Sequence, residues 1–414
     1  MTAPRRPLRV GMVCPYSFGV PGGVQNHVLG LARHLRQAGH RPYVLAPGEL
    51  APSTAALDLE DFASVGAAMP VPYNGSVARV NFGPLSAARV RRWLRNGKFD
   101  LIHIHEPITP SISLLALWAA EQPVVATFHT ATPRSRSMQL ASGVLRAAIE
   151  KIDAGIAVSE SARNVVIQHL GRDAVVIPNG IRFDDFATRR PLMRAETRPS
   201  TGAVLSPSTS SGRRLSKGSG HVAGSLRPTE QSRLIFIGRL DEPRKGLDVL
   251  LAAVPLIRKA RPNLEVVVAG QGSRTLPTWC SNLGTITHEA KIALLGTADV
   301  FVAPHLARES FGIVLLEAMA SGVQVVASDL PPFVDLLGAP QDEQRLGEVF
   351  SVGDHRALAR AVLQVLDSPD SQRAARAQQA ARSYDWSSVG ATVLAVYRAA
   401  LSTAPAGRTG NSIG

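Results

Sequence analysis

Two carboxylates eight residues apart, Glu309 and Glu317, bracket the start of a short apolar helix predicted over 313–320. Ser310 is the predicted N-cap, and Gly312 would let a ligand approach the backbone closely. A helix N-terminus presents unpaired N–H groups and the positive end of the helix dipole, so it attracts an anion such as phosphate. Carboxylates beside it could accept hydrogen bonds from a sugar. The stretch fits a sugar phosphate site, but the same glutamates could equally be ordinary helix residues.

A basic loop supplies cations of the kind that such a ligand would require. Arg239 and Lys245 lie within Gly238–Gly246, after an apolar strand expected at 234–239 and before a helix that begins at Leu247. A planar arginine fork and a lysine point charge suit a diphosphate held from the side opposite the 313–320 helix. A solvated basic loop is the alternative, and the two stretches together favour the diphosphate clamp.

His129 follows directly after an apolar strand expected at 124–128. Ligands of parallel α/β sheets bind beyond the carboxyl ends of the strands, so this histidine could donate a hydrogen bond to a substrate. His103 and His105 are weaker candidates of the same kind. No metal site is predicted, because no Asp-x-Asp pair is placed to bridge a metal to a diphosphate, although a Mg²⁺ requirement stays open.

The order of apolar segments indicates how these residues are positioned. Apolar strands alternate with helices through both halves of the chain, which is typical of parallel sheets covered on both faces. We therefore predict an α/β fold of two doubly wound Rossmann-like domains, 1–181 completed by a helix at 385–401, and 232–384, facing each other across a deep cleft. Strands are expected at 8–14, 43–46, 101–105, 124–128, 155–158, 175–178, 234–239, 264–269, 300–303 and 323–327.

The connection at 182–231 has a different character. Between Ala187 and Gln231, seven Arg and one Lys against two Glu contribute +6 of the net charge of +13. This Ser- and Arg-rich stretch has almost no apolar periodicity, so we predict a disordered insertion, and a disordered tail at 402–414. The charge left for the rest of the chain is ordinary for a protein that handles phosphates, and no nucleic-acid partner is predicted.

Cysteine content and the lengths of the apolar runs limit where in the cell the protein is expected. Two cysteines at no metal spacing fit a reducing compartment, and no apolar run has the length of a signal peptide core or a membrane span. A helix expected at 85–98, with Ser86 as N-cap, carries an apolar face of Val90, Trp93 and Leu94 beside several arginines. This pattern is typical of a helix on an anionic membrane surface, although a solvated basic face is the alternative. The arginines are Arg89, Arg91, Arg92 and Arg95.

The segment Glu309–Glu317 resembles the E-x7-E motif of retaining glycosyltransferases of family 4, which have the GT-B fold, and Gly238–Gly246 resembles their diphosphate-binding loop. More narrowly, further segments are similar to the actinobacterial phosphatidylinositol mannosyltransferases that add the first mannose. The resemblance implies GDP-mannose as donor, phosphatidylinositol as acceptor, no tightly bound cofactor, and a cytoplasmic protein peripheral on the inner membrane leaflet. These segments are Gly11–Phe18, Pro21–Gln25, Pro72–Arg79, His103–Pro107, Ala126–Thr130 and Asp241–Gly246.

The resemblance also implies roles for single residues. Glu309 and the backbone at 311–313 would hold the mannose, Glu317 the ribose, and His129 would contact the sugar near the reacting carbon. The donor-binding residues would be Gly23, Arg239, Lys245, Ile286, Lys291, Glu309, Ser310, Phe311, Gly312, Ile313 and Glu317, with Ile286 and Lys291 beside the guanine. The inositol phosphate site would be Tyr16, Gln25, Asn74, Arg79 and Arg134, and Arg89, Arg91, Arg92, Trp93 and Arg95 would rest on the membrane.

Departures from the family pattern keep rival interpretations open. Gly19, Arg134 and the pair Ala307-Arg308 replace an acidic residue, a lysine and a glycine pair. One rival is the same fold with another donor and acceptor, for example UDP-N-acetylglucosamine and inositol phosphate. A second is a non-catalytic sugar-nucleotide-binding protein docked on membranes. A dehydrogenase is disfavoured, because neither glycine-rich loop has the dinucleotide-binding spacing.

Overall fold

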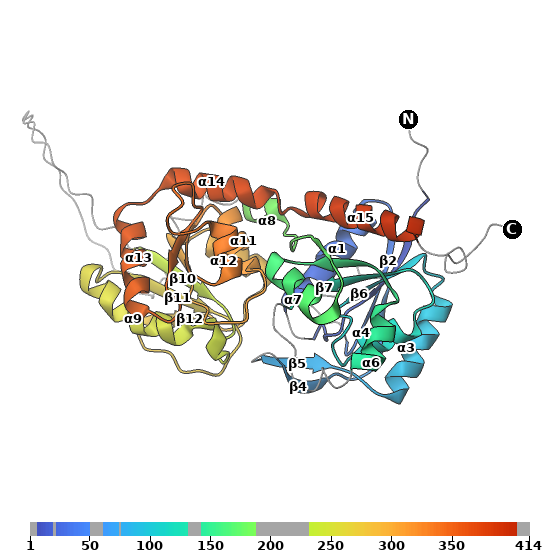
Figure 1. The fold of residues 1–414 in the computed structure, drawn as a ribbon. Coiled ribbons are helices and arrows are strands. Elements are labelled where there is room, and N and C mark those ends of the chain that lie inside the picture. The colour runs from blue at the N-terminus through green and yellow to red at the C-terminus, as the bar shows by residue number, and fades with distance from the viewer. Residues whose placement is uncertain are drawn as a thin grey trace, which may run out of the picture.

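Two parallel sheets, each flanked by helices, form two lobes that lie next to each other (Figure 1). The structure is a computed structural model that describes residues 6–19, 22–49, 61–73, 76–130, 142–187 and 232–403. The predicted α/β fold of two doubly wound sheets is confirmed. The connection expected at 182–231 is helical at 183–187, and the insertion expected within it falls on 188–231, outside the described residues, as does most of the expected tail.

The first lobe is built on a seven-stranded parallel sheet in the order β3-β2-β1-β6-β7-β8-β9. Its central strands are buried on both faces, and β7 is accordingly almost entirely apolar, whereas β6 also carries the buried His103 and His105. The strand order reverses between β1 and β6, and a ligand crevice is expected at such a point. The strands are β1 (Arg9–Val13), β2 (Arg41–Ala46), β3 (Phe62–Ser64), β6 (Leu101–His105), β7 (Val124–Phe128), β8 (Ile152–Ala157) and β9 (Val175–Val176). Its helices are α1 (Gly23–Gln37), α3 (Pro84–Asn96), α4 (Ile112–Ala119), α6 (Ser142–Ile149) and α7 (Glu160–Leu170).

The second lobe is built on a six-stranded parallel sheet in the order β12-β11-β10-β13-β14-β15, which reverses between β10 and β13. The strands are β10 (Arg233–Ile237), β11 (Glu265–Ala269), β12 (Cys280–Asn282), β13 (Val300–Ala303), β14 (Gln324–Ser328) and β15 (Glu348–Phe350). Its helices are the 3₁₀ turn η1 (Pro243–Lys245), α9 (Leu247–Ala260), α10 (His288–Leu295), α11 (Ile313–Ala320), α12 (Pro331–Leu337), α13 (His355–Asp367) and α14 (Ser371–Arg382).

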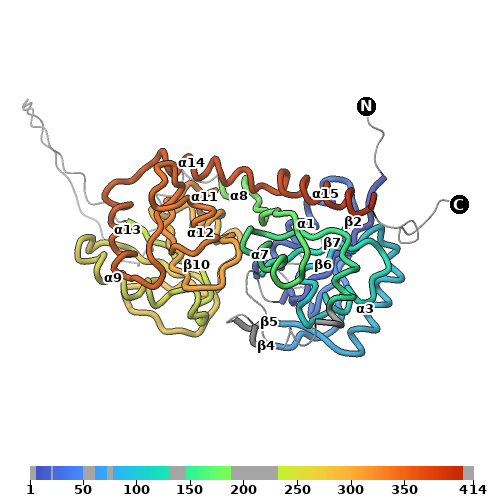
Figure 2. The backbone as a smooth tube through the Cα atoms, viewed as in Figure 1, coloured from blue at the N-terminus to red at the C-terminus, as the bar shows by residue number. Residues whose placement is uncertain are grey.

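Among the described residues the chain crosses between the lobes twice, before α8 (Phe183–Ala187) and again between α14 and α15 (Trp386–Thr403), as Figure 2 shows. The last helix, α15, returns to the first lobe and packs on α1. Gly30 makes this possible, because a Cβ there would lie 2.3 Å from Nε1 of Trp386. Trp386 and Tyr397 are buried in the core beside Val28 and Leu31. The C-terminal helix is therefore part of the first lobe's hydrophobic core.

Most strands begin and end within a few residues of the prediction, and 101–105, 124–128 and 300–303 agree at both ends. The strand expected at 155–158 begins earlier, at Ile152. The last helix ends at Thr403, so residues 402 and 403 are helical and not part of a tail. Three edge strands and the antiparallel hairpin of β4 (Met69–Tyr73) and β5 (Ser76–Val80) were not predicted, because they are short or lack an apolar run. No helix in the described ranges is long and apolar enough to cross a bilayer.

Candidate active site

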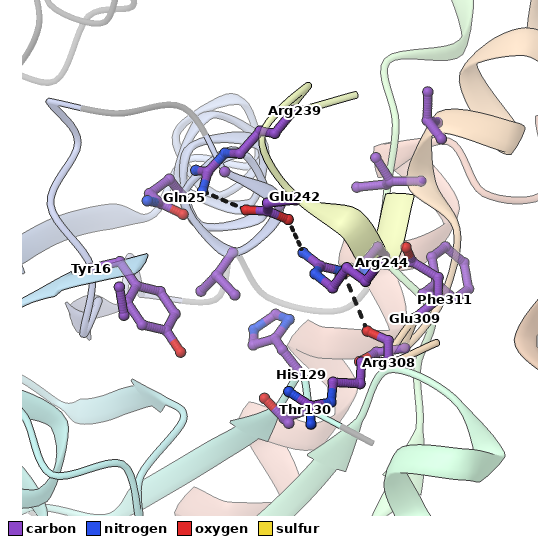
Figure 3. A pocket seen from close by; sticks show the side chains of 18 of the residues that line it. Tyr16, Gln25, His129, Thr130, Arg239, Glu242, Arg244, Arg308, Glu309 and Phe311 are labelled. Carbon is purple, nitrogen blue, oxygen red and sulfur yellow. Dashed lines mark hydrogen bonds and ion pairs between the residues drawn. The ribbon is translucent and has the colours of Figure 1, made fainter. Parts of the chain in front are cut away.

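A pocket of about 370 Å³ lies between the two lobes. It collects residues from the loop before α1, the ends of β5 and β7, the loop after β10, and the segment that leads into α11. Figure 3 shows Tyr16 and Gln25 at one end of it and Glu309 and Phe311 at the other. Twelve residues from the predicted site line it: Tyr16, Gly23, Gln25, Arg79, His129, Arg239, Lys245, Glu309, Ser310, Phe311, Gly312 and Ile313.

Helix α11 begins as predicted at Ile313, but its N-cap is Gly312 and not Ser310. Gly312 has a φ of 101°, in the left-handed region that favours glycine. A Cβ at this position would lie 2.9 Å from the ring of Phe333, so the contact with α12 also requires glycine. The N-terminal end of α11 consequently faces the pocket, with Ser310 and Phe311 in the lining.

The basic loop after β10 lies along one wall of the pocket, and its cations are held by carboxylates. Arg239 and Arg244 both bind Glu242, at 2.9 and 2.7 Å, and Lys245 lies 3.0 Å from Glu309. Figure 3 shows the contacts that run from Arg239 through Glu242 to Arg244. Five cationic side chains and two carboxylates line the pocket, which leaves an excess of three positive charges. The electrostatic field of the pocket therefore favours an anionic ligand.

Glu309 is ionised at neutral pH. Burial opposes the charge, but the Lys245 ammonium and the His305 imidazole outweigh it and hold the pKa of Glu309 well below its usual range. Burial and the Lys245 charge lower the pKa of His305 to about 4, so this histidine is neutral. Nδ1 of His305 lies 2.9 Å from the Glu309 carboxylate and donates to it. Sequence reasoning missed His305, whose position two residues beyond the end of β13 was the available signal.

His129 lies on the other lobe, at the carboxyl end of β7, and its ring lines the pocket. Its backbone N–H and the hydroxyl of Thr130 both donate to the buried carboxylate of Glu106, at 2.7 and 2.8 Å. Glu106 has a φ of 51°, a strained conformation for a residue with a side chain. Glu106 follows β6 directly and fixes the segment that carries His129. Glu106 belongs to the segment His103–Pro107, which resembles the family, but no role was predicted for it from the sequence.

Within the described ranges, one group of side chains could hold a metal ion: His27, His105 and His129, whose ligand atoms lie within 4.8 Å of one another. Imidazole nitrogen suits transition metals, whereas Mg²⁺ prefers oxygen ligands. The cluster thus does not fit the Mg²⁺ that the sequence analysis left open.

The predicted nucleotide end of the donor site lies outside the pocket lining. Lys291 on α10 and Glu317 on α11 form an ion pair with each other, and Ile286 is half-buried in the loop before α10. Ile313 lines the pocket and Glu317 is on the same helix, so the Lys291–Glu317 ion pair lies farther along α11 from the pocket. The predicted acceptor residues Asn74 and Arg134 fall outside the described residues.

Helix α3 differs from its prediction in two ways. Its N-cap is Gly83, and Ser86 is buried with its hydroxyl on Asn81. Val90 and Leu94 are buried in the core, and Trp93 is half-buried with its ring 4.4 Å from that of Phe99. The interpretation of this apolar face as a membrane contact is therefore wrong. The four predicted arginines of this helix are all exposed.

Comparisons with known proteins agree with this architecture. Glycosyltransferase Family 4 matches residues 21–185, and Glycosyl transferases group 1 matches residues 231–368. The phosphatidyl-myo-inositol mannosyltransferase of Propionibacterium freudenreichii is 44% identical over 95% of both chains. That of Mycolicibacterium smegmatis is 43% identical over 94% of this chain and 93% of its own.

Solved structures show the same fold. A glycosyltransferase from Rickettsia africae has a TM-score of 0.67 at 18% identity, covering 95% of this chain and 99% of its own. HepE of Anabaena, solved with UDP and glucose, has a TM-score of 0.65 at 18% identity, covering 94% and 99%. Both matches extend across the two lobes, as does the sequence identity. The chain belongs to glycosyltransferase family 4, and within it to the family of the phosphatidyl-myo-inositol mannosyltransferases.

Proposed function

We propose that the protein transfers mannose from GDP-mannose to the inositol ring of phosphatidylinositol, with retention of configuration, at the inner leaflet of the membrane. The observation that carries this proposal is the pocket between the lobes, where an excess of positive charge and the end of α11 meet the ionised Glu309. A nucleotide sugar has a matching distribution of groups, with an anionic diphosphate next to a polyol. The relatives named as mannosyltransferases support mannose as the sugar.

The donor would lie with its diphosphate against Arg239, Lys245 and the N–H groups at the start of α11. As the bond from the anomeric carbon to the phosphate oxygen breaks, negative charge develops on the diphosphate, and these groups stabilise it. The departing oxygen takes the proton of the attacking inositol hydroxyl on the same face of the sugar. The new bond forms on that face, so configuration is retained without a dedicated protein base.

The acceptor would enter from the first lobe. Tyr16, Gln25 and Arg79 line the pocket on that side, and Arg79 provides a cation for the phosphate of the lipid headgroup. The exposed arginines of α3 lie on the same lobe, close to the exposed side chains of Phe82 and Leu85. Exposed apolar groups beside cations suit the surface of an anionic membrane.

A matrix of donors and acceptors tests the proposal. The wild-type protein and the variants Arg239→Ala and Glu309→Ala are incubated with GDP-mannose or UDP-N-acetylglucosamine, and with phosphatidylinositol vesicles or soluble inositol phosphate. We expect labelled mannose in the lipid only with GDP-mannose and vesicles, and a loss of at least a hundredfold in kcat/KM for each variant. Transfer from the UDP-sugar to soluble inositol phosphate would favour the rival enzyme, and no transfer with any pair would favour a non-catalytic binding protein.

A further inference from the structure

Four buried histidines, His27, His103, His105 and His129, lie together beneath the pocket. The rings of His103 and His105 are stacked with centroids 4.3 Å apart, and those of His105 and His129 are stacked at 5.3 Å. His27 on α1 packs edge-on against His129, at 4.8 Å. His103 and His105 are two residues apart on β6, so both side chains point to the same face of the sheet.

The hydrogen bonds in this cluster differ from ring to ring. Both ring nitrogens of His103 are bonded, Nδ1 to the Tyr397 hydroxyl at 2.7 Å and Nε2 to the Thr127 hydroxyl at 2.6 Å. Nδ1 of His105 lies 3.0 Å from Nε2 of His129. Nε2 of His105 is buried and has no hydrogen-bond partner among the described residues. Nε2 of His129 is therefore engaged with His105, and Nδ1 of His129 is the nitrogen that remains for a ligand in the pocket.

A neutral imidazole carries one proton, so the bond between His105 and His129 allows two arrangements. If His129 donates, its Nδ1 is a bare acceptor and His105 buries an N–H at Nε2 without a partner. If His105 donates, its unpartnered Nε2 is a bare lone pair and His129 carries its proton on Nδ1. Buried N–H groups without a partner are rarer and costlier than underused acceptors, so the second arrangement is favoured.

We propose that His105 is a positioning residue for His129: it donates from Nδ1 to Nε2 of His129 and so fixes the tautomer in which Nδ1–H of His129 points to the pocket as a neutral donor. A sugar hydroxyl of the bound donor is the acceptor that such a group would recognise. This inference rests on the proposed function for the role of His129 toward the sugar, but the tautomer itself does not.

Burial keeps the rings neutral. The pKa of His129 is held well below its usual value by burial and by His27 and His103, and that of His105 is lowered by burial and the neighbouring histidines. The neutral state matters because an imidazolium would present N–H groups at both nitrogens, and His105 could not donate to it. A metal held by His27, His105 and His129 is the competing arrangement, and it would take a lone pair from one ring nitrogen of each.

The first experiment is independent of activity. Nitrogen-15 NMR of the full-length protein, labelled at histidine, distinguishes Nδ1–H, Nε2–H, imidazolium and metal-bound rings, and His129 is assigned by comparison with His129→Gln. We expect His129 as the Nδ1–H tautomer, unchanged after dialysis against EDTA. An Nε2–H tautomer, a charged ring, or a spectrum that changes on dialysis together with release of a transition metal would overturn the proposal.

The second experiment compares His105→Asn, His105→Leu and Tyr397→Phe. An asparagine amide can donate from nearly the position of the histidine Nδ1, whereas leucine cannot donate. Tyr397→Phe also removes a buried hydrogen bond, but one that holds His103, so it is the matched control. We expect His105→Leu to lose the Nδ1–H tautomer of His129 and about tenfold to hundredfold in kcat, and the other two variants to keep both.

The two readouts separate the possible failures. An unchanged His129 tautomer in His105→Leu, or an equal loss of kcat in His105→Leu and Tyr397→Phe, would reduce His105 to a structural residue. Absence of mannose transfer by the wild-type protein would defeat the proposed function and leave the NMR result as the test of the tautomer.

Discussion

Gly246 holds the basic loop against the segment that carries Glu309. It follows η1 with a φ of 69° and is also the N-cap of α9. A Cβ at this position would lie 1.6 Å from the carbonyl oxygen of Pro304, at the end of β13. The N–H of Leu306 donates to the carbonyl of Arg244, at 2.8 Å, so two backbone contacts join the two segments. We predict that Gly246→Ala separates Lys245 from Glu309 and disables donor binding.

The magnitude follows from geometry. Contacts of a Cβ below 3.0 Å are essentially absent from real structures, so the two segments must move apart by about 1.4 Å. Such overpacking costs about 1–3 kcal/mol, and the left-handed backbone adds about 1–2 kcal/mol for alanine. A misplacement of about 1 Å in a catalytic site can cost on the order of a hundredfold in rate. We therefore expect about 2–5 kcal/mol lower unfolding free energy and at least a hundredfold lower kcat/KM for GDP-mannose.

Gly171→Ala is the matched control. Gly171 caps α7 with a φ of 63°, but a Cβ there meets nothing within 4 Å, so only the backbone term of about 1–2 kcal/mol applies. Urea unfolding, calorimetric titration with GDP and initial rates of mannose transfer are measured for both variants. Equal losses of stability in the two variants, with GDP affinity unchanged in Gly246→Ala, would refute the claim that the Pro304 contact positions the basic loop.

Three further predictions concern other parts of the molecule. Burial lowers the pKa of His27 to about 4, so on acidification the unfolded chain binds a proton before the folded chain does. The free energy of unfolding should therefore fall between pH 6.5 and pH 4, by about 3 kcal/mol from this residue. Urea unfolding across that range measures this decrease, and a flat profile would contradict it. Leu85 is 77% exposed, so Leu85→Asp should lower the affinity for anionic vesicles about tenfold, measured by cosedimentation, without changing the melting temperature. Equal binding by the variant would exclude Leu85 as a membrane contact. Arg308 has a φ of 55° and is one of the five pocket cations, so Arg308→Gly should raise the unfolding free energy by about 1 kcal/mol and weaken GDP binding several-fold. Unchanged GDP affinity in calorimetric titration would exclude the Arg308 side chain from the field that holds the diphosphate.

The local sequence was sufficient to predict the strands that position the candidate site. The mainly apolar runs at 124–128 and 300–303 are buried on both sides, so their composition indicates central strands, and at 101–105 the apolar residues flank two buried histidines. Once these strands are placed, His129 and the stretch before α11 must lie at the carboxyl ends of two sheets. The rule that ligands bind there then identified residues that the structure brings into one pocket.

The errors arose where a distant contact decides the local structure. Ser310 is a better N-cap by residue type than Gly312, but the ring of Phe333 and the left-handed backbone determine where α11 begins. The apolar face of α3 shows the same limit, because an amphipathic pattern has the same period whether the face packs on a membrane or on the protein's own core. Glu106 gave no signal of its own, since its role depends on β7 lying next to β6.

The geometry of the candidate site depends on a small connection between the lobes. The two crossings are hydrogen-bonded to each other: the N–H of Ile181 donates to Tyr384, and the N–H of Trp386 donates to Ile181. Phe183, just beyond, donates to the carboxylate of Asp385 at 3.0 Å. Helix α8 packs on α11 and α14, so it belongs mechanically to the second lobe, whereas α15 belongs to the first. Because His129 and Lys245 lie on opposite lobes, a rotation confined to this short paired segment changes the distance between them while each sheet stays rigid.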